Sequence, residues 1–403
     1  MSDSSKQEYQ AVVIGGGIAG VAIVRALEKI GLKDFLVIDS ASAFGTKTSG
    51  HDAALCHPYV GRGASRLQRL TQLAFSEALE VWKNEWHQTG VFYLPKYQEE
   101  FNSNEVGEHL VKLGYAPHQA VVATFGSENF SGIYFPKGGW INIGKVCRDA
   151  QSCIPQERLL LETTVKGLKF SQERWQVMGE DEEIICQAHR VFVASALGTQ
   201  AIMESVGINV PLKPVRGQLT KFQFEKDSIW HKKSFDMAIC GNVYVLPPEK
   251  KNDHIFEVCL GSTYDENSND LNIWPQSNIE NIQKLKEVLN LESASDPNIS
   301  GQFVGIRCVS KDRLPVMGPI RGRPGLYVLT ALGSRAVMWS ALATQIFSEH
   351  LSYEIQEEVF LDTRFFAGAR LAAAGLTSDL LSALSVERFF AGASNSKPIL
   401  PSD

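Results

Sequence analysis

The sequence has 403 residues, 44% hydrophobic and 21% charged, which is typical of a globular chain of two domains or one large interleaved unit. Its net charge of −6 argues against a general nucleic-acid-binding protein, because such domains are usually basic. No apolar run reaches the length of a transmembrane segment, and the polar residues 1–10 lack the basic and apolar regions of a signal peptide. The seven cysteines show no CxxC pair or metal-ligand spacing, so they predict reduced thiols in a cytoplasmic protein without a metal site.

The first predicted elements are a strand, a helix and a second strand near the N-terminus. Residues 11–14 are a short apolar run stopped by glycines, as expected of a buried parallel strand. Residues 18–30 carry apolar side chains at helical spacing without a proline, and residues 35–38 form a second apolar run that ends at Asp39. This order of elements is typical of the start of an α/β domain.

A glycine fingerprint lies in the turn between the first strand and the helix. Gly15 permits the tight turn, Gly17 lets the backbone approach a pyrophosphate, and Gly20 lets the helix pack closely on the strand. The unsatisfied N–H groups at the helix start favour anionic phosphates, and Asp39 is placed to accept hydrogen bonds from ribose hydroxyls. The motif in this context predicts dinucleotide binding but does not by itself distinguish FAD from NAD.

Three later segments indicate which dinucleotide is bound. Residues 47–54 (KTSGHDAA) resemble the loop that lies along the cofactor in the glycine/D-amino-acid oxidase superfamily of flavoproteins. Residues 191–198 (VFVASALG) resemble its turn over the ADP moiety, and residues 325–335 (GLYVLTALGSR) its late strand and glycine turn, followed by a helix over about 336–350. The positive end of that helix suits the negative charge of a reduced flavin ring, so the resemblance implies FAD.

The fingerprint and this resemblance together define the expected cofactor contacts. They are Gly15, Gly17, Ile18, Ala19, Gly20, Asp39, Ser40, Ser49, Gly50, Ala53, Ala54, Val165, Ala194, Gly198, Arg307, Gly333, Ser334, Arg335 and Ala336. No metal ligand is expected beside them.

A narrower resemblance is to the FAD-dependent domain of the bifunctional tRNA 5-methylaminomethyl-2-thiouridine biosynthesis proteins (MnmC). It rests on residues 135–140 (FPKGGW), 305–318 (GIRCVSKDRLPVMG), 331–335 (ALGSR) and 384–389 (LSVERF), and it covers nearly the whole chain. Because only ten residues precede the first predicted strand, we expect the flavin half of those proteins without the methyltransferase half.

Arg307 is the candidate that would select the substrate. The matching arginine of the superfamily motif G-x-R-x-x-[ST]-x-D-x-x-P binds the substrate carboxylate, and a guanidinium can hold a carboxylate through two parallel charge-assisted hydrogen bonds. The alternative is a structural arginine that ties two strands together. Asp312 and Pro315 are predicted to form the turn that positions this loop.

The resemblance also implies a reaction. The tRNA-modifying family oxidises the carbon–nitrogen bond of a carboxymethylaminomethyl group on a uridine, and water hydrolyses the resulting imine to glyoxylate and the shortened amine. Such chemistry needs a deprotonated amine, a held carboxylate and correct orientation rather than a nucleophile. Tyr244 is the second catalytic candidate, on the substrate side of the flavin, with a packing role in a strand as the alternative.

Further side chains have structural alternatives. Arg216 approaches the flavin edge or forms a salt bridge between domains, and Trp140 packs near the flavin or fills the core. Arg335 is placed near the pyrimidine end of the flavin. His51 replaces an asparagine of the resembled family, so no contact is carried over to it, and His57 lies in the same loop.

The sequence leaves three functions open. The first is oxidation of a tRNA side chain, and the second is oxidation of a free small-molecule amine such as glycine, sarcosine, proline or a D-amino acid. The third is a non-catalytic flavin-bound scaffold that serves in an assembly. This function stays open because the segment RFFAGA occurs twice in the C-terminal tail, at 364–369 and 388–393. The apolar stretch between them either docks a partner or a membrane surface, or packs as a terminal helix on the flavin domain. Two basic clusters offer phosphate contacts or a merely solvated face: Arg62, Arg66 and Arg69, and Lys311, Arg313, Arg321 and Arg323.

The predicted fold is α/β, with a Rossmann-like FAD-binding domain and a second, mostly antiparallel α+β substrate domain. The FAD-binding domain is discontinuous and takes residues 8–82, 141–214 and 305–370, while residues 83–140 and 215–304 form the substrate domain. Within the substrate domain, apolar and polar residues alternate over 219–224 and 255–261, which predicts strands with one buried face. A C-terminal helix and tail take residues 371–403, of which 394–403 are expected to be disordered. The substrate is expected to lie between the domains, above the flavin ring.

Overall fold

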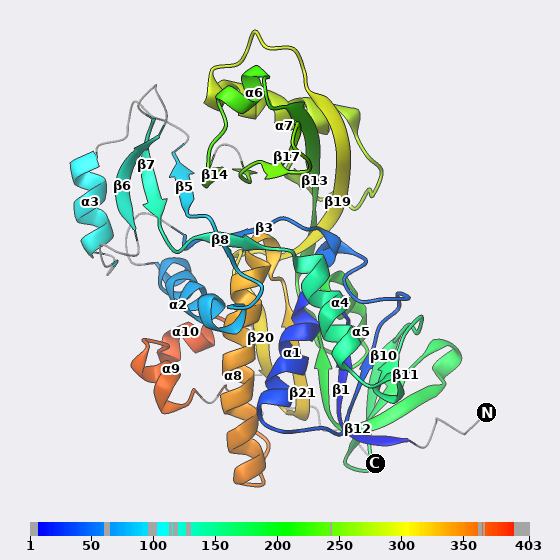
Figure 1. Cartoon of the computed structure of the whole chain (residues 1–403). Helices are drawn as coiled ribbons and strands as arrows, with labels where there is room; N and C mark the ends of the chain where they lie inside the picture. Colours follow the sequence, from blue (N-terminus) through cyan, green and yellow to red (C-terminus); the bar gives the residue numbers. More distant parts are fainter. Residues whose placement is uncertain are drawn as a thin grey trace.

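The computed structural model of the chain combines an α/β part with a second part built on a largely antiparallel sheet (Figure 1). The structure describes residues 7–59, 65–95, 103–112, 115, 120–125, 130–241, 244–361, 365 and 367–390. The fold class predicted from the sequence is therefore confirmed. None of the helices within these ranges combines the length and the apolar character that crossing a bilayer requires.

An eight-stranded sheet forms the α/β part, and its centre is parallel in the order β9–β2–β1–β12–β21. The parallel strands are β1 (Glu8–Ile14), β2 (Phe35–Ile38), β9 (Leu159–Leu160), β12 (Ile184–Val193) and β21 (Arg323–Thr330). Three antiparallel strands extend the sheet: β10 (Gly167–Ser171), β11 (Arg174–Met178) and β20 (Val316–Ile320). The first strand begins three residues earlier than its apolar run predicts, because pairing with β12 continues to Glu8.

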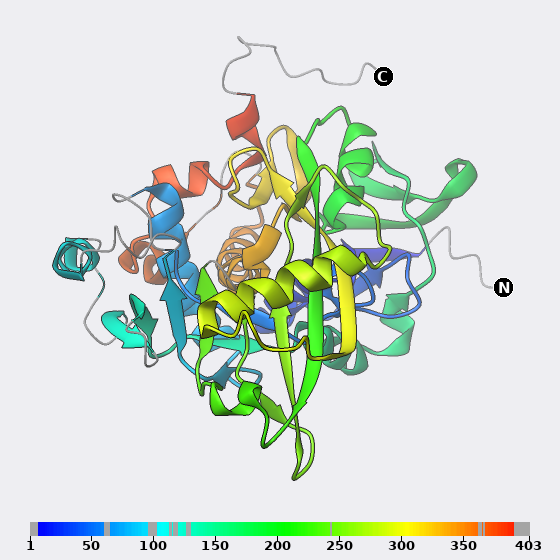
Figure 2. The same ribbon diagram turned by 90° about the horizontal axis from the view of Figure 1, so that it is seen from above.

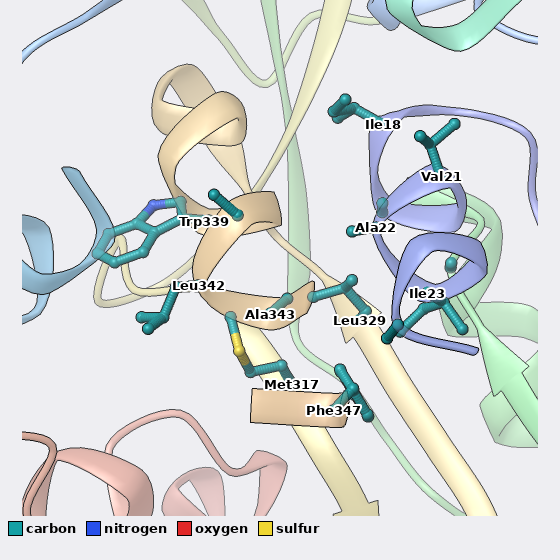
Figure 3. Close-up of a cluster of buried hydrophobic side chains, with 14 of the residues drawn as sticks. Ile18, Val21, Ala22, Ile23, Met317, Leu329, Trp339, Leu342, Ala343 and Phe347 are labelled. Atoms are coloured by element: carbon teal, nitrogen blue, oxygen red, sulfur yellow. The ribbon is translucent and has the colours of Figure 1, made fainter. Parts of the chain in front are cut away.

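Two helices cover one face of this sheet, α1 (Ile18–Lys29) and α8 (Ala336–Gln356) (Figure 3). Figure 3 shows Ala22 of α1 on the side of that helix that faces α8, with Leu329 of β21 between Ala343 and α1. The Thr344 hydroxyl donates a hydrogen bond to the Ala22 carbonyl at 3.1 Å across this contact. α8 extends six residues beyond the end predicted near residue 350, because a buried helix does not show the one-sided apolar pattern that marks a surface helix.

A ten-stranded sheet forms the second part, and every pairing in it is antiparallel except that of β14 with β5. Its strands are β5 (Val91–Leu94), β6 (Val121–Phe125), β7 (Phe130–Phe135), β13 (Leu212–Glu225), β14 (Ala238–Gly241), β15 (Tyr244–Val245), β16 (Glu249–Lys250), β17 (Ile255–Gly261), β18 (Asp265–Glu266) and β19 (Asn298–Ser310). The strands predicted over 219–224 and 255–261 are confirmed within β13 and β17. Helix α7 (Pro275–Leu289) lies across β13 and β19 in the view of Figure 2.

The remaining elements surround these sheets. A small third sheet joins β3 (Ala54–Cys56), β8 (Gly139–Ile141) and β4 (His87–Gln88). The other helices are α2 (Arg66–Val81), α3 (Ser103–Lys112), α4 (Ile143–Cys153), α5 (Thr199–Glu204) and α6 (Ile229–Lys232).

The two parts are connected by the long antiparallel pair β13 and β19. Leu212 pairs with Ser310 at one end and Gln223 with Asn298 at the other. The domain boundaries proposed near residues 214 and 304 fall inside these two strands, and the division into domains stays a prediction.

The C-terminal segment differs from the prediction of a single helix, which is wrong. Two short helices, α9 (Ala369–Ala373) and α10 (Ser378–Ser382), are separated at Gly375, whose φ of +99° ends the first helix in a conformation that favours glycine. Leu371, Leu380 and Leu384 are fully buried in the core beside α8, so this segment packs on the α/β part. The expectations for residues 364, 366 and 391–403 lie outside the described residues.

Phe347 tests the contact of α8 with the sheet. Its ring is fully buried, and it packs edge-on against Phe192 and Tyr327. We expect Phe347→Ala to lower the free energy of unfolding by about 3–5 kcal/mol, because the substitution leaves a cavity. Phe360→Ala, at a ring that is 41% exposed, is the control and should cost less than about 1 kcal/mol in the same urea titration. Equal losses for the two variants would contradict this packing role.

Candidate active site

The glycine fingerprint lies where β1 ends and α1 begins, and two of its glycines leave no room for a side chain. A Cβ on Gly15, whose φ is +120°, would lie 2.5 Å from the carbonyl oxygen of Ala194. A Cβ on Gly20 would lie 1.7 Å from the carbonyl oxygen of Gly15. Gly17 starts the helix without a side-chain cap, so backbone N–H groups face the turn as an anion site requires.

The end of β2 completes this region. The Asp39 carboxylate accepts hydrogen bonds from the backbone N–H of Gly16 at 2.5 Å and of Ala41 at 2.7 Å. The Ser49 hydroxyl accepts one from the N–H of Ile18 at 3.2 Å. Segments that are far apart in the sequence therefore meet at one edge of the sheet, in an arrangement that fits the ADP end of a dinucleotide.

A cleft of about 370 Å³ is lined by residues from both sheets. Nine of the residues predicted from the sequence line it: Ser49, Ala53, Ala54, Tyr244, Arg307, Gly333, Ser334, Arg335 and Ala336. The others predicted to contact the cofactor lie outside its lining: Gly15, Gly17, Ile18, Ala19, Gly20, Asp39, Ser40, Gly50, Val165, Ala194 and Gly198. The cleft thus lies at the N-terminus of α8, and the glycine turn at the start of α1 is not part of its lining.

Arg307 projects from β19 across the neighbouring strand β13. Its guanidinium occupies the space above Gly217, where a Cβ would lie 2.2 Å from Nη1. Nη1 donates to the carbonyl oxygens of Arg216 and Thr263, both at 3.4 Å, and Nη2 donates to the Ser262 hydroxyl. Among the described residues no carboxylate forms an ion pair with it. Burial lowers the pKa of Arg307 to about 10, so the group stays charged at neutral pH.

Among the described residues, the charged side chains that line the cleft are all basic. Its lining contains Lys284, Arg307 and Arg335 but, in the part of the chain that is described, no aspartate or glutamate. Lys284 is paired with Glu280 at 2.6 Å, whereas the Arg335 guanidinium lies 5.1 Å from the ring centre of Tyr59. The cleft is therefore suited to an anionic ligand.

Two histidines line the cleft in their neutral form. Burial, and to a lesser degree the neighbouring Arg307, lower the pKa of His51 to about 4. Burial likewise lowers the pKa of His57 to about 4, with Arg335 contributing. His57 is held by the carbonyl oxygen of Pro58 at 2.8 Å and by the thiol of Cys240 at 3.2 Å.

Tyr244 reaches the cleft from the short strand β15. Its hydroxyl donates a hydrogen bond to the carbonyl oxygen of Ala53, and burial raises its pKa well above the usual value. The side chain is therefore a neutral phenol that fixes the loop after η2 (Thr48–Gly50) against the second sheet.

Two candidates from the sequence lie elsewhere. Arg216 of β13 is fully buried. Its Nη1 forms an ion pair with the Asp265 carboxylate of β18 at 3.0 Å, and its guanidinium carbon lies 3.8 Å from the ring centre of Trp274. It does not line the cleft, and its salt bridge joins two strands of one sheet rather than two domains. The Trp140 ring stacks on that of His87 with the ring centres 4.2 Å apart, and Trp140 does not line the cleft either.

The second basic cluster is divided by a strand, and the first lies only partly within the described residues. Lys311 and Arg313 precede the five-residue strand β20 and Arg321 and Arg323 follow it, which separates the two pairs by roughly 16 Å at the rise of a strand. In the other cluster, Arg69 pairs with Asp379 of α10 at 3.2 Å, and Arg62 lies outside the described residues.

Sequence reasoning missed part of the cleft wall. Ser262, Tyr264, Asn281 and Lys284 line it from the loop after β17 and from α7. Nothing in their spacing relates them to Arg307, because they reach the same cleft only through the pairing of β13 with β17 and β19 and the contact of α7 with β13. All seven cysteines are free, and the described residues contain no cluster of His, Cys, Asp and Glu with the geometry of a metal site.

A family model and curated relatives match most of the chain. The family described as FAD dependent oxidoreductase (DAO) matches residues 10–350. The chain is 27% identical over 377 residues to the tRNA 5-methylaminomethyl-2-thiouridine biosynthesis bifunctional protein MnmC of Marinobacter nauticus, covering 88% of this chain and 56% of the relative. For the MnmC of Thiobacillus denitrificans the identity is 28%, covering 92% and 62%. The chain thus spans less than two thirds of the length of these relatives.

Solved structures with a similar fold include glycine oxidase from Geobacillus kaustophilus, with a TM-score of 0.69 and 17% identity over 92% of this chain and 99% of that one. L-proline dehydrogenase from P. horikoshii also has a TM-score of 0.69, with 16% identity over 96% and 99%. At these identities the likeness shows the fold alone.

The neutral histidines generate a prediction on stability in acid. The pKa of His51 and of His57 is about 4 in the folded protein against an ordinary value of 6.5, so between these limits the unfolded chain binds more protons. The free energy of unfolding should therefore fall as the pH decreases from 6.5 to 4. His57→Gln should show a shallower fall in melting temperature over this range than the wild type, while the exposed control His254→Gln should not. Parallel curves for all three proteins would refute the assignment.

Proposed function

The chain belongs to the DAO family of FAD-dependent oxidoreductases, and from this premise we propose that it oxidises the carbon–nitrogen bond of an N-substituted glycine group. The observation that carries the proposal is Arg307, an unpaired guanidinium in a cleft whose described lining contains no carboxylate. The favoured substrate is the carboxymethylaminomethyl side chain of a uridine in tRNA. The relatives named as tRNA-modifying proteins, which match most of this chain, support that choice.

Arg307 would bind the carboxylate of the substrate. Its Nε–H and one N–H of Nη2 have no hydrogen-bond partner among the described residues, and these two donors match the two oxygens of a carboxylate. The hydrogen bonds to Ser262 and Thr263 hold the side chain in place before the substrate arrives, which reduces the entropy lost on binding.

The same charges would prepare the amine. Positive groups such as Arg307 and Arg335 disfavour a protonated amine beside them, so they lower its pKa and increase the fraction with a free electron pair. The histidines of the cleft carry no charge at neutral pH and do not oppose this effect.

Bound FAD supplies the acceptor for the hydride that leaves the carbon beside the amine. Gly15, Gly17, Gly20 and Asp39 would hold its ADP moiety, and residues 333–336 at the start of α8 would lie at the ring. The amine nitrogen loses its proton to solvent, the product is an imine, and water then converts it into glyoxylate and the shortened amine. A tRNA substrate and free cysteines fit a cytoplasmic protein.

Anaerobic bleaching of the flavin tests the substrate class. The holoprotein is mixed separately with hypomodified tRNA, glycine, sarcosine and proline, and absorbance near the flavin maximum is followed. We expect tRNA that carries the carboxymethylaminomethyl group to bleach the flavin, with release of glyoxylate. Bleaching by the free amines alone would replace the tRNA proposal with an amino-acid oxidase or dehydrogenase. No bleaching by any of them would favour the flavin-bound scaffold.

Arg307 and Gly217 provide a paired test of carboxylate binding. Arg307→Met should lower kcat/KM by roughly 30-fold or more, because it leaves the substrate carboxylate without its charged partner. Gly217→Ala should act in the same direction through a higher KM, since the new methyl group would displace the guanidinium while disturbing only the end of a side chain. Gly301→Ala, a strand glycine with room for a Cβ, is the control. Full substrate affinity in Arg307→Met would refute the carboxylate site.

A further inference from the structure

One aromatic side chain stands at the wall of the cleft, open to solvent. Tyr264 follows β17 in the same loop as Ser262 and Thr263, and it is 44% exposed. Phe170, Phe360 and Phe390 are the other described aromatic residues of similar exposure, and none of them lines the cleft. An exposed ring at this place can contact whatever part of a ligand extends outward from the interior.

Two arginines lie beside the Tyr264 ring. The guanidinium carbon of Arg307 lies 5.5 Å from the ring centre, and that of Arg313 lies 5.2 Å from it. Arg313 also donates a hydrogen bond to the Tyr264 hydroxyl, and Glu266 fixes Arg313 through an ion pair at 2.7 Å. Because Arg313 and Glu266 are themselves about half exposed, the ring marks the boundary between the interior of the cleft and solvent.

This position relates Tyr264 to the substituent on the substrate nitrogen. In an N-substituted glycine only two bonds separate the carboxylate carbon from the nitrogen. A carboxylate held by Arg307 therefore brings the nitrogen and its substituent close to the immediate neighbours of that arginine. Tyr264 is such a neighbour, and its exposed surface lets a large substituent continue into solvent.

We propose that Tyr264 is a stacking platform for a planar aromatic group carried on the substrate amine, the chemistry of a pyrimidine base. Aromatic side chains recognise unpaired bases of RNA by stacking, and the fixed ring would do so at little entropic cost. The inference rests on the proposed function and adds a residue that separates nucleoside-bearing amines from free amino acids.

The test compares amines that differ only in the substituent on nitrogen. Sarcosine carries a methyl group and N-benzylglycine a planar ring without any nucleotide, and hypomodified tRNA carries the base itself. Tyr264→Ala should lower kcat/KM for N-benzylglycine and for tRNA by about 10-fold to 100-fold, mainly through KM. For sarcosine the change should stay within about twofold, as for a surface substitution that leaves the carboxylate site intact.

Two further variants serve as controls. Tyr264→Phe keeps the ring and should retain the preference for the planar substituent. Phe360→Ala removes an equally exposed ring that lies 4.6 Å from Arg190, remote from the cleft lining, and should change none of the ratios. Dissociation constants of N-benzylglycine, measured from the perturbation of flavin absorbance, give the same comparison without turnover.

The outcomes separate this inference from the proposed function. An equal loss for sarcosine and N-benzylglycine in Tyr264→Ala would show that the ring only shields Arg307, and it would overturn the platform. An unchanged dissociation constant and rate for N-benzylglycine would overturn it as well. Wild-type protein that leaves tRNA unoxidised, yet needs Tyr264 for N-benzylglycine, would refute the tRNA substrate and retain the platform.

Discussion

The pairing of β13 with β19 is the interaction on which the cleft depends. It sets Val215 opposite Arg307 and Gly217 opposite Gly305, so Arg307 and Gly217 share one face of the sheet. A shift of the register by one residue would turn Arg307 to the other face, where Arg216 is buried against Asp265. Two arginines from paired strands thus have different roles, because successive side chains of a strand point to opposite faces.

Burial then decides which groups of the cleft carry charge. Arg307 remains charged because even its lowered pKa of about 10 lies far above neutral pH, whereas the same burial leaves His51 and His57 neutral. With no carboxylate among the described lining residues, the charged groups that line the cleft are all basic, as an anionic ligand requires. The N-terminus of α8 adds its partial positive charge at the same place.

The parts of the site that the sequence predicted are those with local signatures. Gly15 and Gly20 are recognisable because the backbone leaves no space for a Cβ, and Asp39 is recognisable because it ends a short apolar strand. Ser262 and Tyr264 have no such signature, since their relation to Arg307 arises only from strands that meet far apart in the chain. The prediction of a single C-terminal helix was wrong for a related reason. Leu371, Leu380 and Leu384 are buried by tertiary packing, and a glycine between them ends the first of two short helices.

By itself the sequence determined the α/β class and the glycine turn, and its resemblance to a superfamily motif singled out Arg307. The fold class and the turn depend on backbone conformation and apolar periodicity, which act over a few residues. Only the tertiary structure decided that Arg307 rests on Gly217, that Arg216 is structural, and that Tyr264 stands at the edge of the cleft. Those relations are fixed by strand register and by the burial of charge, and neither quantity is a property of a short segment.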